Sequence, residues 1–85
     1  MSAATESVVD WAAMLTELRV MGIGAGMIAQ RVHMTSGMIR EYRLGVKSPG
    51  HANGEKIIDY WMHKTSKTRE QLPMTEKVVA MATGT

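Results

Sequence analysis

Apolar residues near the N-terminus recur at spacings of three and four, which is typical of an amphipathic helix with one buried face. The stripe consists of Val8, Trp11, Leu15 and Leu18, widened by Ala12. Glu6 and Asp10 fall near the start of this stripe, where the helix dipole favours negative charge. Gly22 follows its last apolar residue. The pattern predicts a helix over residues 6–21.

The middle of the chain predicts two short helices joined by a turn. Residues 25–32 place Ile28, Ala29 and Val32 on one face. A turn at His33 and Met34 follows. A second helix then begins at Thr35–Ser36, where a hydroxyl can cap it, and ends at Gly45.

The last third predicts two more helices. One is capped by Asn53, carries apolar residues at helical spacing and runs to about Leu72, where Pro73 stops it. Thr75 then opens a short helical segment. No strand pattern is found, so the expected fold is all-α, a compact domain of about five helices. Trp11 and Trp61 lie in apolar stripes and are interpreted as core residues rather than as base-stacking platforms.

The segment around Ala29 has the pattern of a helix-turn-helix. Two helices that cross steeply need a small residue at their contact, and Ala29 supplies it. They also need apolar residues at set offsets from it, so that both helices seat on the first helix. Those offsets are occupied by Ile28, Val32, Met34, Ile39 and Tyr42. The second helix would then present its first turn outward, where it can enter a DNA groove.

Over about residues 11–62 the chain resembles the Cro/repressor (lambda-repressor-like) family of helix-turn-helix proteins. The resemblance includes Tyr42-x-x-Gly45-x-x-x-Pro49, similar to that family's aromatic–Gly–Pro signature after the recognition helix. It implies a compact helical domain, usually dimeric, that binds a short inverted repeat of double-stranded DNA and regulates transcription. Such proteins are common in bacteriophages and other mobile elements.

Three positions depart from the family pattern. His33 stands where the turn usually has Gly, and His is one of the residues that tolerate a left-handed backbone. Gly26 stands where the family often has a phosphate-binding Gln, and it offers only its backbone N–H. Gly37 lies inside the recognition helix and lowers helix stability by up to about 1 kcal/mol relative to Ala, although a glycine on the groove side also allows close approach to a base edge.

The resemblance assigns candidate DNA contacts. The base-reading positions are Ser36, Gly37, Arg40 and Glu41. Arg40 has the chemistry to pair with a guanine edge or, alternatively, to contact a phosphate; Glu41 accepts from cytosine or pairs with a neighbouring Arg. Candidate phosphate contacts are Gly26, Gln30, Arg31, Thr35, Arg43 and Lys47.

Charge placement fits a polyanionic partner. The net charge is +2, but residues 22–69 hold eight Lys or Arg against three Asp or Glu, a net of +5, while both ends are slightly acidic. Phosphate neutralisation dominates protein–DNA affinity, so a basic centre is favourable.

Other chemistry finds little support in the sequence. The chain has no cysteine, which excludes disulfides and thiolate zinc sites and fits a reducing cytoplasm, in a bacterial or phage-infected cell. The three histidines have no second ligand at metal-site spacing. The glycine-rich 22–26 loop lacks the strand or the Gly-Lys-Ser/Thr of a nucleotide site. We expect a soluble protein that is not an enzyme, needs no metal or cofactor and does not insert in a membrane.

The sequence suggests two parts, a helix-turn-helix domain over residues 1–64 and a C-terminal extension over 65–85. The extension carries apolar residues that we expect to form a homodimer contact, namely Leu72, Met74, Val78, Val79 and Met81. Alternative functions are an accessory factor of transposition, recombination or packaging, and a helical protein-interaction module that lost DNA binding.

Overall fold

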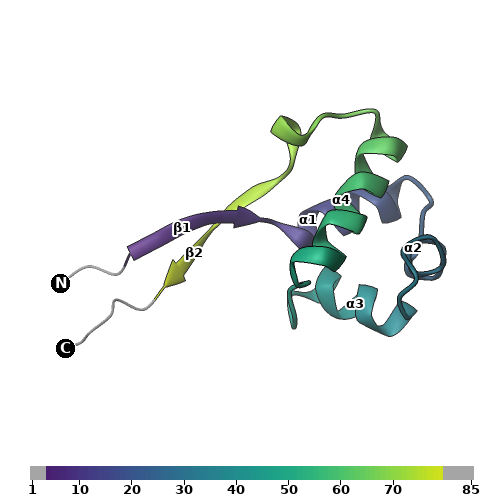
Figure 1. The fold of residues 1–85 in the computed structure, drawn as a ribbon, viewed down its shortest axis with the longest axis horizontal. Helices are drawn as coiled ribbons and strands as arrows, with labels where there is room; N and C mark the ends of the chain where they lie inside the picture. The colour runs from purple at the N-terminus through teal and green to yellow at the C-terminus, as the bar shows by residue number, and fades with distance from the viewer. Residues whose placement is uncertain (1–3, 80–85) are drawn as a thin grey trace.

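Four α-helices form the body of the protein, and a two-stranded antiparallel ribbon extends from it (Figure 1). The computed structural model describes residues 4–79. Its elements are β1 (Ala4–Val9), α1 (Trp11–Val20), α2 (Ala25–Val32), α3 (Ser36–Leu44), α4 (His51–Thr65), a 3-10 turn η1 (Arg69–Gln71) and β2 (Met74–Val79). The expectation of a compact, mostly helical domain is confirmed, but within residues 4–79 the fold has four α-helices and a small sheet rather than being all-α with about five helices.

The first helix starts later than predicted, because residues 4–9 form a strand. Asp10 is the N-cap of α1: its Oδ1 accepts a hydrogen bond of 3.0 Å from the backbone N–H of Ala13. The backbone N–H of Asp10 donates to the carbonyl of Pro73 at 2.8 Å. These two bonds fix the point where the ribbon joins the body. The β-branched pair Val8–Val9 suits a strand, and its partner strand lies almost seventy residues away.

The fourth helix begins and ends earlier than predicted. It starts at His51 with Gly50 as N-cap, so Asn53 lies within its first turn and does not cap it. It ends at Thr65, where Ser66 adopts a left-handed conformation with φ 59°. The Thr65 hydroxyl donates to the carbonyl of Trp61 at 2.7 Å and accepts from the backbone N–H of Lys67 at 3.2 Å. The backbone N–H of Lys67 therefore bonds to the Thr65 hydroxyl instead of continuing the backbone hydrogen bonds of the helix. The predicted extension of α4 to Leu72 does not form.

The C-terminal segment that was predicted as helix from Thr75 is strand β2 instead. Its register with β1 runs from Ala4 opposite Val79 to Val9 opposite Met74. The last residues of the predicted helix, and Met81 of the predicted dimer contact, lie outside the described residues. Of the residues predicted to form the dimer contact, Met74 and Val78 of β2 are exposed. Leu72, which precedes β2, is instead buried in the core.

The core lies between the four helices and is centred on Trp61, whose side chain is fully buried. The side chains buried with it come from all four helices and include Met14, Leu15, Leu18, Ile28, Ile39 and Ile57. Trp11 is partly buried and packs against this cluster. The expectation that both tryptophans belong to the core is confirmed for Trp61, and Trp11 covers its edge.

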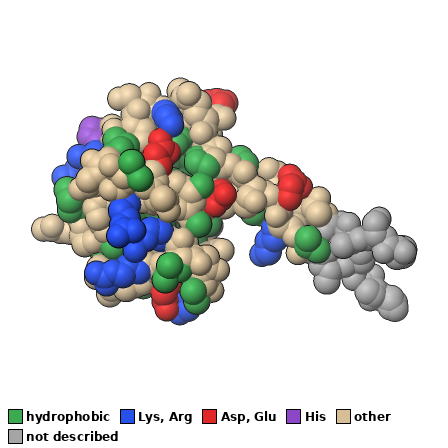
Figure 2. Space-filling model, turned by 180° about the vertical axis from the view of Figure 1, so that it is seen from behind, with side chains coloured by type: hydrophobic (Ala, Val, Ile, Leu, Met, Phe, Trp, Pro, Cys, Tyr) green, Lys and Arg blue, Asp and Glu red, His purple; other side chains and the backbone are tan. Residues whose placement is uncertain are grey.

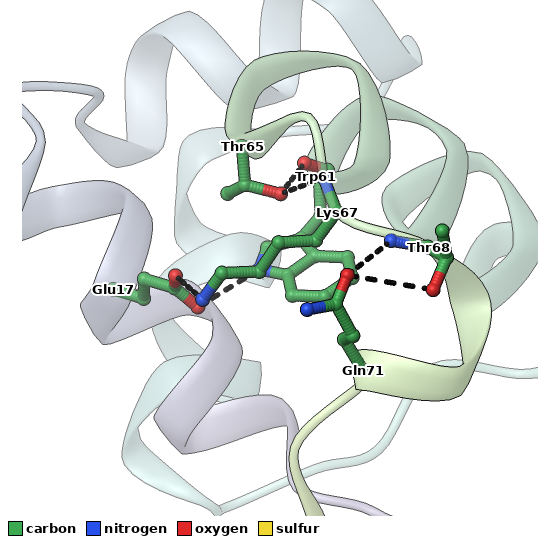
Figure 3. Close-up of polar contacts among 6 residues, drawn as sticks. All are labelled: Glu17, Trp61, Thr65, Lys67, Thr68 and Gln71. Carbon is green, nitrogen blue, oxygen red and sulfur yellow. Dashed lines mark hydrogen bonds and ion pairs between the residues drawn. The ribbon is translucent and has the colours of Figure 1, made fainter.

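A polar contact closes the core between α1 and α4 (Figure 3). The indole N–H of Trp61 donates to Glu17 Oε1 at 3.0 Å, and Lys67 Nζ donates to Glu17 Oε2 at 2.6 Å. Bonding to Lys67, and then to Trp61, holds the pKa of Glu17 below its ordinary value. The carboxylate is only partly exposed, so this contact is less screened by solvent than a surface ion pair.

No single helix within residues 4–79 is long and apolar enough to cross a membrane. Taken together, α1 and α2 have sufficient length and apolar composition, but they meet at a bend of 112°.

Because the pKa of Glu17 is lower in the folded protein than the ordinary value of 4.5, its contacts stabilise the fold above that pH, and this contribution is lost as the pH falls through the lowered pKa. We expect Glu17→Gln to lower the unfolding free energy at neutral pH by about 1 kcal/mol and to flatten its decline in acid. Urea unfolding at a series of pH values measures both effects. Glu55→Gln, which breaks the more exposed pair with Arg69, is the matched control and should cost less; equal losses in the two variants would contradict the assignment.

Candidate nucleic-acid interface

Helices α2 and α3 pack against each other, and the small residue that the sequence pattern singles out is buried. Ala29 is 4% exposed. Ile28 and Val32 of α2 and Ile39 and Tyr42 of α3 are also buried. α3 packs on α1, and α2 packs on both α3 and α4. The apolar faces of the two helices therefore seat on the rest of the body and leave their opposite faces in solvent.

The turn between them depends on His33. This residue has φ 58° and ψ 48°, the left-handed conformation, and its backbone N–H donates to the carbonyl of Ala29. The N–H of Met34 donates to the same carbonyl at 2.9 Å. His33 thus does what glycine does in most such turns, and the chain leaves α2 in two residues rather than continuing as one rod.

The start and end of α3 follow the predicted signals. Thr35 is its N-cap, and its hydroxyl oxygen accepts from the backbone N–H of Met38 at 3.1 Å. Gly45 ends the helix with φ 79°, a conformation that side-chain-bearing residues rarely adopt. α3 is therefore a rigid unit of nine residues with both ends defined.

The four predicted base-reading residues share the outer side of α3. Gly37 and Arg40 are exposed, while Ser36 and Glu41 are half-buried. Arg40 Nη1 lies 3.4 Å from Ser36 Oγ, one helical turn away. A long contact of this kind leaves the other guanidinium N–H groups available to a ligand.

Glu41 pairs within the chain, with a cation that was not anticipated. Its Oε1 lies 3.6 Å from Lys47 Nζ, not beside an Arg; the Lys47 side chain is 65% exposed and that of Glu41 42%. The pair joins one predicted base-reading residue to one predicted phosphate contact. It holds Lys47 over the end of α3.

The predicted phosphate contacts surround the outer side of the two helices. Gly26, Gln30, Arg31 and Thr35 are exposed, as is Lys47, and Arg43 is half-buried. Arg31 lies in the last turn of α2 and Arg43 in the last turn of α3. The structure thus leaves all six candidates at least partly accessible.

Three arginines of this surface form no ion pair within the described residues. Within residues 4–79 the ion pairs are Lys47–Glu41, Lys67–Glu17 and Arg69–Glu55. Arg31, Arg40 and Arg43 take part in none of them. Figure 2 shows Lys and Arg side chains gathered on one face of the body, away from the ribbon. Within residues 4–79 the charges of these three arginines are therefore not neutralised by an ion pair, whereas that of Lys47 is paired with Glu41.

Two glycines of α2 and α3 have no structural reason to be glycine. Gly26 and Gly37 lie inside helices without a positive φ. A Cβ added to Gly26 would meet nothing within 4 Å, and one added to Gly37 would meet only the Thr35 hydroxyl at 3.9 Å. The fold would accept alanine at either position, and alanine is the better helix former.

Sequence reasoning missed the ribbon and the cleft beside it. A cavity of about 420 Å³ lies where the ribbon meets the body, lined in part by Trp11, Pro49, Ile58, Leu72 and Met74. The valine pairs at 8–9 and 78–79 and the threonines at 5 and 75 are the sequence signals that favour strands there. Among residues 4–79 there is no group of three His, Cys, Asp or Glu placed to bind a metal ion.

Comparison of the chain with protein-family models, with curated proteins and with solved structures finds no match.

Because His33 is exposed and lies in the left-handed region, replacing it tests the turn without disturbing the core. We expect His33→Val to lose roughly 1–2 kcal/mol of unfolding free energy, since a β-branched side chain clashes in this conformation. His33→Gly should match or exceed the wild type. Thermal unfolding of the three proteins measures this, and an unchanged midpoint for the valine variant would show that the turn is not held as described.

Proposed function

We propose that this protein binds double-stranded DNA in a sequence-specific way and regulates transcription, as Cro/repressor-type proteins do, with α3 as the recognition helix. One observation carries the proposal: the outer side of α3 presents Gly37 and Arg40 to solvent, and Arg40 forms no ion pair within the described residues. Ile39 and Tyr42 anchor the helix from behind. A rigid helix with short side chains at its start fits the major groove.

Arg40 supplies the base-reading chemistry in this proposal. Its guanidinium can donate two parallel hydrogen bonds to the O6 and N7 of a guanine. Ser36, one turn earlier, holds the guanidinium near the helix and toward the N-terminal end of α3. Glu41 shapes the site indirectly, because its pair with Lys47 competes with any contact to cytosine.

The surrounding cations position the protein on the DNA backbone. Arg31 and Arg43 lie on the two helices and form no internal ion pair within the described residues. The backbone N–H of Gly26 and the side chains of Gln30 and Thr35 add neutral donors. Contacts of this type fix the register of a protein on a duplex without reading its sequence.

A homodimer on an inverted repeat completes the proposal. One α3 reads only a few base pairs, and two copies related by a twofold axis would read half-sites about one helical turn apart. The apolar side chains exposed beyond α4, Met74 and Val78, are available for such a contact.

The proposal predicts DNA binding that is strongly salt-dependent and that depends on Arg40. On a sequence selected from a random duplex pool, log affinity should fall linearly with log salt concentration, as several phosphates are neutralised. Arg40→Ala should cost about 1–3 kcal/mol on that sequence and relax one base position. Fluorescence anisotropy with labelled duplexes measures both.

Lys77→Ala is the matched control, because it removes one positive charge from the ribbon instead of from α3. It should leave base preference unchanged. Equal losses on all sequences would make Arg40 a phosphate contact. No binding at moderate salt would overturn the proposal in favour of a protein-interaction module.

Because a side chain at position 37 would meet no obstacle in the fold, replacing Gly37 provides a second test of the proposed interface. We expect Gly37→Ala to raise the unfolding free energy by about 0.5–1 kcal/mol, because alanine is the better helix former and nothing obstructs its methyl group. The same methyl group would stand between α3 and the base edges, so affinity for the selected duplex should fall at least tenfold. Gly22→Ala, at a positive φ outside the interface, should instead destabilise the protein. A Gly37→Ala variant that gains stability and binds DNA unchanged would remove Gly37 from the interface.

A further inference from the structure

The ribbon is a sheet with two open edges. β1 and β2 pair only with each other in the part of the chain that the structure describes, and they run out from the body (Figure 1). Thr5, Glu6, Ser7 and residues 74–78 are all exposed. A two-stranded ribbon by itself is marginally stable in water, and an open strand edge is a template for another strand.

We propose that the outer edge of β1 pairs antiparallel with β1 of a second copy of this chain, about a twofold axis at Ser7. The product is a four-stranded sheet in the order β2–β1–β1–β2. The strand pairing is argued from the register, exposure and charge of β1 and β2. Only the argument from half-site spacing below rests on the proposed DNA-binding function.

The charges of the two strands exclude three registers and are compatible with the one at Ser7. In a twofold antiparallel pair one residue faces its own copy, and its neighbours pair symmetrically on either side. Centring on Glu6, Glu76 or Lys77 would set like charges directly opposite each other, which is destabilising. Centring on Ser7 sets two hydroxyls together and engages residues 5–9.

The same register also aligns exposed apolar side chains. Residues 5, 7 and 9 share one face of β1, opposite Val78, Glu76 and Met74 of β2. Thr5 then faces Val9 of the second copy, and the row across the four strands reads Val78, Thr5, Val9, Met74. Val78 and Met74, 65% and 51% exposed in the single chain, stand at the two ends of that row. Each dimer contains this row twice.

On the other face, Glu6 keeps Lys77 of its own chain opposite it and meets Val8 of the second copy. Each acidic residue of β1 therefore stays next to its own cation. No like charges are set directly opposite each other anywhere in the shared register.

The resulting distance between the two bodies suits the proposed DNA target. The described molecule measures 46 × 26 × 21 Å, and a six-residue strand accounts for roughly 20 Å of its length. The axis lies about 7 Å before the end of β1, so the body centres would be about 40 Å apart, close to one turn of duplex.

Cysteine cross-linking tests the register, since the chain has no cysteine of its own. Opposed residues of an antiparallel pair have Cα atoms about 4.5–5.5 Å apart, a span that a disulfide bridges. We expect purified Ser7→Cys to form a covalent dimer on mild oxidation at micromolar concentration. Glu6→Cys, one position away and equally exposed, should cross-link at least tenfold more slowly, because it faces Val8 of the second copy. Equal rates in the two variants, or no dimer from Ser7→Cys, would overturn the proposal.

A charge swap provides an independent test by sedimentation equilibrium. Inside one chain Ser7→Lys faces Glu76, a favourable pair, so the unfolding midpoint should hold or rise. Across the axis it sets Lys against Lys, and we expect at least a tenfold weaker dimer. Mixing it with the double variant Ser7→Glu, Glu76→Lys should restore dimers as heterodimers. A Ser7→Lys protein that dimerises like the wild type would contradict the edge we assign.

Both measurements are made without DNA, so the two proposals fail separately. A cross-linked dimer that shows no salt-dependent DNA binding would overturn the proposed function alone. A monomer that binds a single half-site would overturn the ribbon pairing and the proposed homodimer, but not DNA binding through α3.

Discussion

The burial of Trp61 is the constraint on which the rest of the structure depends. Its ring is completely removed from solvent, and its one polar group is bonded to Glu17 on α1. A buried indole N–H without a partner would offset a large part of the free energy gained by burying the ring. The buried position of Trp61 therefore depends on its hydrogen bond to the Glu17 carboxylate. Once α4 is held against α1, α3 packs on α1 and α2 on α4, and the outer sides of α2 and α3 are the ones left in solvent.

The same carboxylate links the body to the ribbon. Glu17 also binds Lys67, the residue that directly follows the left-handed Ser66 at the end of α4. The chain then turns through η1, whose Thr68–Gln71 capping box is made of side chains close in sequence. This return brings Pro73 to the backbone of Asp10, and from there the two strands pair outward. One acidic side chain on α1 thus helps to set the path by which the chain returns from α4 to the base of the ribbon.

Helices α2 and α3 and the turn between them were predictable because their determinants are local. Ala29, the Thr35 cap and Gly45 interact with residues close to them in the sequence. The observed bounds of α2 and α3 accordingly match the predicted ones. The ribbon was not predictable in this way. Val8 fits a helical stripe with Trp11 as well as it fits a strand, and only pairing with residues 74–79 decides between them. The predicted end of α4 was wrong for a related reason. Lys67 lies outside the helix and binds Glu17, which is fifty residues earlier in the chain.

The charge of the ribbon differs from that of helices α2 and α3. In the body, Lys67 and Arg69 are bound to carboxylates, whereas the arginines of α2 and α3 have no ion pair within the described residues. The two strands together hold Glu6, Glu76 and Lys77, a net charge of −1. A polyanion is therefore attracted to the helices and weakly repelled by the ribbon. A ribbon that disfavours polyanions but exposes strand edges and Val78 is suited to protein contact, so in the proposed dimer DNA would not compete for the edge that a second copy would occupy.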